Sequence, residues 1–85
     1  MNTLLNLSDT MTPENKKSLW AYIRKAGDNL DGKLPQSPRH PKGRNPYAHI
    51  AKCIKSKYGR SYGELSDDDY DDVVRFIDYL VENPF

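Results

Sequence analysis

Residues 45–82 constrain the fold more strongly than any other part of the sequence. Asn45 followed by Pro46 is typical of a helix start, because Asn caps free backbone N–H groups and Pro fits the first turn. Apolar residues then recur at helical spacing until Gly59, a natural left-handed stop. The pattern predicts a helix over residues 46–58. Its apolar stripe consists of Tyr47, Ile50, Ala51, Ile54 and Tyr58.

A second helix is predicted after a short connector. The serine and three aspartates at residues 66–69 form a capping-box pattern, and the acids lie where the helix dipole favours negative charge. An apolar stripe follows and ends before Pro84. We therefore expect a helix over residues 67–82. Its stripe consists of Tyr70, Val73, Val74, Ile77 and Val81.

An earlier helix completes the fold. Thr12 and Pro13 repeat the pattern of a cap followed by proline, and Gly27 is the expected stop, so this helix is predicted over residues 13–26. Trp20 lies at the edge of its apolar stripe, where we expect it to close the edge of the core. The three helices predict a small all-α domain around one core. The expected core is Leu19, Ile23, Ile50, Ile54, Leu65, Val74 and Ile77.

The remaining segments are expected to be irregular. Residues 28–44 are interrupted by prolines and glycines and carry basic side chains, which predicts a long basic loop between the first two helices. Residues 1–11 are interpreted as an N-terminal arm, either a short extended segment or disordered chain. Residues 12–85 then form a single helical domain.

Charge is strongly segregated along the chain, although the net charge is only +1. Residues 33–60 carry eight basic groups and no acid, whereas residues 61–85 carry eight acids and only Arg75 as a base. One interpretation is that the basic and acidic helices face each other. The other is that one surface is built to bind a charged partner.

Several functional classes are not favoured. The single Cys53 excludes an internal disulfide, and no apolar run approaches the roughly 20 residues that cross a membrane. The N-terminus does not resemble a secretion signal, so a soluble cytoplasmic protein without a membrane partner is predicted. His49 and Cys53 are four residues apart, but a structural zinc normally takes four ligands, and His40 alone does not complete them. No metal or cofactor is predicted.

Catalysis is not predicted either, because no nucleophilic triad or glycine-rich phosphate loop is visible. Nucleic-acid binding agrees better with the basic loop and the helix after it, whose N-terminus offers further backbone donors. The predicted contact residues for nucleic acid or an acidic partner are Arg39, Lys42, Arg44, His49, Lys52 and Lys55.

The last helix suggests an alternative. Three residues at spacings i, i+3 and i+4 form a second apolar side, which is typical of a face that binds another protein or a second copy of the chain. The alternative prediction is therefore a protein-interaction or oligomerisation module that inhibits a host or phage protein. The residues of this predicted protein interface are Phe76, Tyr79 and Leu80.

The same region resembles a known family. Its features are the Tyr58-Gly59 step, the connector from Ser61-Tyr62 to Leu65, and a helix that carries Tyr70, Val74, Phe76 and Ile77. This pattern resembles the C-terminal (ORF6C-type) domain of phage antirepressor proteins, over about residues 11–82. The resemblance implies a phage or prophage regulatory protein in a bacterial host cell. Such a protein acts by binding DNA, a repressor or another protein, and the family offers no catalytic residues.

Overall fold

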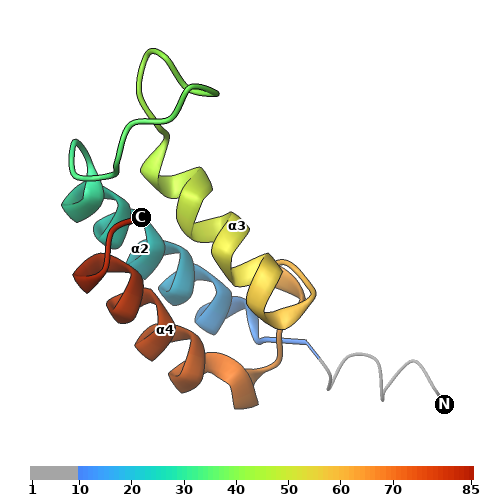
Figure 1. Ribbon diagram of the computed structural model, residues 1–85. Helices are drawn as coiled ribbons and strands as arrows, with labels where there is room; N and C mark the ends of the chain where they lie inside the picture. Colours follow the sequence, from blue (N-terminus) through green and yellow to red (C-terminus); the bar gives the residue numbers. More distant parts are fainter. Residues whose placement is uncertain (1–9) are drawn as a thin grey trace, which may run out of the picture.

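The computed structural model describes residues 10–85 and contains three α-helices in this range (Figure 1). They are α2 (Pro13–Leu30), α3 (Pro46–Tyr58) and α4 (Tyr70–Glu82). Two short 3-10 turns, η1 (Tyr62–Glu64) and η2 (Asp67–Asp69), connect α3 to α4. Helix α2 packs along both other helices, whereas α3 and α4 contact each other less extensively. The predicted small all-α domain is confirmed.

Helix α3 begins and ends as the sequence predicts. The side-chain oxygen of Asn45 accepts hydrogen bonds from the backbone N–H groups of Tyr47 at 2.9 Å and Ala48 at 3.1 Å. Gly59 adopts the left-handed conformation, with φ of 76°, and its N–H donates to the carbonyl of Lys55 at 2.8 Å. Both ends are therefore set by local backbone chemistry.

Gly27 does not end its helix, contrary to the prediction. Helix α2 continues to Leu30, and Gly27 is buried inside it. The ring of Tyr47 from α3 lies directly on this glycine: a Cβ atom at position 27 would be 2.3 Å from the Cδ1 atom of Tyr47. The glycine is needed for close approach of α2 and α3, not for a turn.

Helix α4 has a more complex start than predicted. The capping box at residues 66–69 is present, with the carboxylate of Asp69 accepting from the N–H of Ser66 at 3.2 Å. The three residues that follow Ser66 form the 3-10 turn η2, and regular α-helix begins at Tyr70. A 3-10 turn is common at a helix N-terminus, where hydrogen bonds between residues three apart tighten the first turn.

The core lies between all three helices. Every predicted core residue is buried except Val74, which is half-buried. Val73 takes its place, and Leu80 is also fully buried, with 0% of its surface exposed. Leu80 was predicted in a protein interface, and that prediction is wrong. The buried hydrophobic core is Met11, Leu19, Ile23, Ala26, Leu30, Ile50, Ile54, Leu65, Val73, Ile77 and Leu80.

The segment before α2 is attached to the connector between α3 and α4. Met11 is 2% exposed, and its N–H donates to the carbonyl of Leu65 at 2.8 Å. The carboxylate of Asp67 accepts from the N–H of Thr12 at 2.9 Å and from the amide of Asn15 at 3.0 Å. Met11, which the sequence placed in the arm, therefore belongs to the core. The rest of the predicted arm through residue 9 lies outside the described residues.

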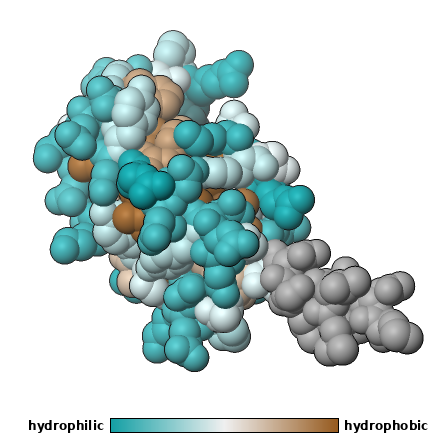
Figure 2. Space-filling model, turned by 90° about the horizontal axis from the view of Figure 1, so that it is seen from below, coloured by the Kyte–Doolittle hydropathy of each residue, from teal (hydrophilic) through white to brown (hydrophobic). Residues whose placement is uncertain are grey.

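Hydrophilic side chains cover most of the face that Figure 2 presents, with apolar side chains in small patches between them. Trp20 is 40% exposed and stacks on Tyr62 of η1, with ring centroids 5.7 Å apart. It therefore covers η1 and does not enter the buried core. In the described part of the chain, no helix combines the length and apolar character that crossing a membrane requires.

Candidate nucleic-acid interface

Each pair of helices is joined by a tyrosine hydroxyl that donates a hydrogen bond to an aspartate. A neutral donor satisfies each carboxylate, so no cation is needed for these contacts. The hydrogen bond to its aspartate raises the pKa of the Tyr22 and Tyr47 hydroxyls, and burial followed by the hydrogen bond raises the pKa of Tyr58. The pairs are Tyr22–Asp78 between α2 and α4, Tyr47–Asp28 between α3 and α2, and Tyr58–Asp72 between α3 and α4.

The acids therefore make few ion pairs. Within residues 10–85 one ion pair is present, between Arg75 and Asp72, with 3.8 Å between nitrogen and oxygen. It lies inside α4, so none of the eight basic residues at 33–60 forms a salt bridge to another described residue. The basic segment is not neutralised by the acidic connector and α4.

The predicted loop residues Arg39 and Lys42 are exposed. They lie in the connection between α2 and α3, which projects beyond the end of the helices (Figure 1). Two hydrogen bonds close turns within this loop. The N–H of His40 donates to the carbonyl of Ser37 at 2.9 Å, and the N–H of Gly43 donates to the carbonyl of His40 at 3.0 Å. Both cations therefore lie exposed on this loop, and neither forms an ion pair with an acid of the described chain.

Arg44 and His49 are less exposed than Arg39 and Lys42, and their side chains contact each other. The Arg44 guanidinium donates to the carbonyl of Pro35 at 3.1 Å and lies 3.0 Å from Nδ1 of His49. A guanidinium can only donate, so Nδ1 accepts and the ring proton is on Nε2. Burial, and then the charge of Arg44, lower the pKa of His49. These two half-buried residues attach the loop to α3.

A hollow of about 180 Å³ separates the loop from α3, and Lys52 lines it together with Arg44 and His49. Lys52 is exposed there. The structure thus brings Lys52 together with two of the predicted contact residues, Arg44 and His49. Lys55 does not line this hollow. It is close enough to Glu64 for its charge, together with that of Arg60, to help lower the pKa of that carboxyl, although hydrogen bonds from Ser61 are the larger cause.

Lys57 is a residue that the sequence did not select. Its Nζ lies 4.7 Å from the ring centroid of Phe76 in α4 and 5.7 Å from that of Tyr58. These distances are typical of a cation–π contact. The sequence could have predicted the contact between Lys57 and Phe76 only if the relative rotation of α3 and α4 had been known.

The predicted protein interface on α4 is only partly exposed. Leu80 is in the core, Phe76 is half-buried and Tyr79 is 55% exposed. The rings of Phe76 and Tyr79 are nearly parallel, with centroids 6.3 Å apart. An aromatic pair remains at this place, but the continuous three-residue apolar face does not exist.

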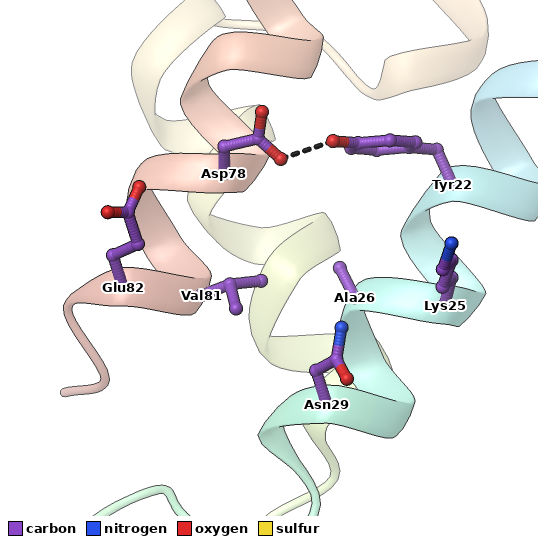
Figure 3. A pocket seen from close by; sticks show the side chains of 7 residues that line it. All are labelled: Tyr22, Lys25, Ala26, Asn29, Asp78, Val81 and Glu82. Carbon is purple, nitrogen blue, oxygen red and sulfur yellow. Dashed lines mark hydrogen bonds between the residues drawn. The ribbon is translucent and has the colours of Figure 1, made fainter.

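A second hollow, of about 250 Å³, lies between α2 and α4 (Figure 3). The Tyr22–Asp78 hydrogen bond closes one side, and Ala26 and Val81 face each other across it. Two carboxylates and one ammonium line it, so it does not extend the cationic surface. Its lining is Tyr22, Lys25, Ala26, Asn29, Asp78, Val81 and Glu82.

Known proteins provide no assignment of this surface. No model of a protein family matches the chain, and no curated protein or solved structure matches it either. The resemblance to the antirepressor domain remains a prediction from the sequence.

His49 and Cys53 do lie together, with 3.8 Å between Sγ and Nε2, and burial raises the pKa of the Cys53 thiol. Among residues 10–85, however, no group of three or more His, Cys, Asp or Glu side chains is placed to hold a metal ion. The imidazole of His49 also packs against Phe85, whose ring it meets edge-on at 5.1 Å.

Proposed function

We propose that this protein is a non-enzymatic module that binds nucleic acid through the basic loop and α3, residues 33–60. The observation that carries the proposal is the unpaired positive charge of this segment. Its eight cations have no acid among them in the sequence and form no ion pair with the described part of the chain. Neutralising phosphates with such cations releases counterions and supplies most of the affinity of non-specific nucleic-acid binding.

Side chains supply most of the phosphate contacts in this proposal. The N-terminus of α3 offers fewer donors than its position suggests, since Asn45 already accepts from the first two available N–H groups. Arg39 and Lys42 on the loop and Lys52 on α3 are all exposed. Arg44 and His49 hold the loop in place beside them.

The resemblance to the antirepressor domain adds a biological setting to the proposal. It assigns the module to phage or prophage regulation in the cytoplasm of a bacterial host. The partner is then DNA, or a repressor that binds DNA. The charge pattern favours the nucleic acid itself, because a phosphate backbone presents regularly spaced negative charge to a segment without acids.

The proposal is tested by fluorescence anisotropy of a short labelled duplex over a series of salt concentrations. We expect the logarithm of the binding constant to fall linearly with the logarithm of salt concentration, and Lys52→Ala to lower the slope by about one unit. The matched control is Lys25→Ala, since Lys25 is equally a lysine but lies in the α2–α4 hollow. Salt-independent binding, or equal effects of both variants, contradicts the proposal.

A further inference from the structure

The groove between α3 and α4 combines exposed aromatic surface with positive charge. It has a volume of about 320 Å³, and its lining is Lys57, Asp72, Arg75, Phe76 and Tyr79. Tyr79 is among the most exposed large apolar residues of the described chain. Its hydroxyl has no hydrogen-bond partner among residues 10–85, unlike those of the tyrosines that join the helices. Because Tyr79 is 55% exposed, its ring is accessible to a partner.

Packing holds this aromatic surface in position. Phe76 meets the ring of Tyr58 edge-on at 6.1 Å, and Tyr79 lies nearly parallel to Phe76, at an angle of 13°. Tyr58 is itself held by its hydrogen bond to Asp72. A base that stacks on Tyr79 therefore meets a ring whose neighbours are fixed, which reduces the entropy lost on binding.

The charges around the groove suit a phosphate beside such a base. Lys57 lies over the ring of Phe76, and Arg75 lines the same groove. Asp72 is the carboxylate in the lining, and it already accepts from Tyr58 and pairs with Arg75. The cation that remains unpaired is Lys57.

The groove includes one cation of the proposed binding segment. His49 touches Phe85, which follows α4, and Lys57 touches Phe76 of α4, so both residues lie on the side of α3 that faces α4. Lys52 lines the hollow next to the loop and is rotated by about 140° from Lys57 around the helix, so it points to another side of α3. The groove therefore shares Lys57 with the basic segment and adds the aromatic rings of α4 to it.

We infer that this groove binds single-stranded nucleic acid, with an unpaired base stacked on Tyr79 and a neighbouring phosphate on Lys57. The inference rests on the proposed function and specifies its substrate class. Aromatic rings beside a cationic groove are the combination that binds single strands without sequence preference. In a duplex, both faces of each base are covered by its neighbours in the stack, so a duplex gains nothing from Tyr79.

Anisotropy with labelled oligothymidine and a duplex of the same length tests this inference. Tyr79→Ala lowers the affinity for oligothymidine by about 5- to 100-fold, the usual effect of removing one stacked base contact, and leaves duplex binding unchanged. Tyr79→Phe retains the ring and keeps the affinity. Lys57→Ala lowers the salt slope for the single strand by about 0.7 units, whereas Tyr79→Ala leaves this slope unchanged.

The outcomes separate the two proposals. If Tyr79→Ala binds oligothymidine as the unmodified protein does while Lys52→Ala still weakens it, the inference is wrong and the proposed function stands. If neither nucleic acid binds, both fail. Equilibrium sedimentation covers the other occupant of the groove: a dimer that Tyr79→Ala dissociates assigns the ring to self-association and overturns the inference. Unchanged thermal unfolding of both Tyr79 variants shows that the fold is intact.

Discussion

The hydroxyl of Tyr58, in the last turn of α3, donates a hydrogen bond to the carboxylate of Asp72 in the first turn of α4. Lys55 and Lys57 are close to Tyr58 in sequence, yet neither forms an ion pair with this aspartate in the described chain. A neutral donor therefore joins the basic helix to the acidic one. The positive charge of α3 stays available to a partner because tyrosines, not lysines, hold its neighbouring acids.

Removing this hydroxyl tests how much the contact stabilises the fold. We expect Tyr58→Phe to lower the free energy of unfolding by about 1 kcal/mol, a value reduced by partial exposure to solvent. Urea denaturation measures it. Tyr79→Phe is the matched control and has no effect, because the Tyr79 hydroxyl has no partner in the described structure. Equal stability of the two variants contradicts the assignment.

The same hydroxyl makes stability depend on alkaline pH. The pKa of Tyr58 is raised above its ordinary value of 10 in the folded state. Its contribution is therefore fully present below about pH 10 and is lost as pH rises through the raised pKa. Urea titrations above pH 10 show a steeper loss of stability for the unmodified protein than for Tyr58→Phe. Parallel curves argue against a raised pKa.

The contact between Gly27 and Tyr47 predicts an effect whose sign depends on the partner. Gly27→Ala lowers the free energy of unfolding by about 1–3 kcal/mol, since the added methyl overlaps the ring of Tyr47. In a Tyr47→Ala background the same change stabilises by up to about 1 kcal/mol, because alanine favours helix over glycine. Urea denaturation of the four proteins measures both effects. A glycine that only ended a helix gives the same sign in both backgrounds.

Leu80 and Tyr79 are neighbours in sequence with opposite expected roles. Leu80→Ala removes a fully buried side chain and costs about 2–5 kcal/mol of stability. Tyr79→Ala changes stability little, because more than half of the side chain is exposed. Thermal unfolding compares them. A stable Leu80→Ala protein restores the predicted interface on α4.

The contact between Arg44 and His49 predicts a response to acid. Burial and the Arg44 charge lower the pKa of His49 below its ordinary value of about 6.5. The stability linked to the neutral ring is present above that value and is lost as pH falls through the lowered pKa. Arg44→Ala raises the pKa of His49, measured by NMR titration of the imidazole protons. Arg39→Ala, the control, leaves this pKa unchanged, since Arg39 lies exposed on the loop.

Helix α4 illustrates how far the sequence predicts the fold and the site. Its apolar residues cover a wide arc, and their spacing alone placed Val74 in the core and Leu80 outside. Packing against α2 and α3 instead selects Val73, Ile77 and Leu80, which follow one another at spacings of four and three. A helical wheel gives the angles between side chains. A helical wheel does not show which side of the helix faces each of the two neighbouring helices.

The sequence by itself determined the presence of three helices, both ends of α3 and the segregation of charge. Asn45 with Pro46, and Ser66 with Asp69, act on backbone groups within a few residues, so their effect needs no tertiary contact. Tertiary structure alone decided which residues meet across helices. Lys57 over Phe76 and Tyr47 on Gly27 join positions about 20 residues apart, and their contact depends on the rotation and crossing of whole helices. Local signals carry no information on that geometry, because it results from burying all three apolar stripes at once.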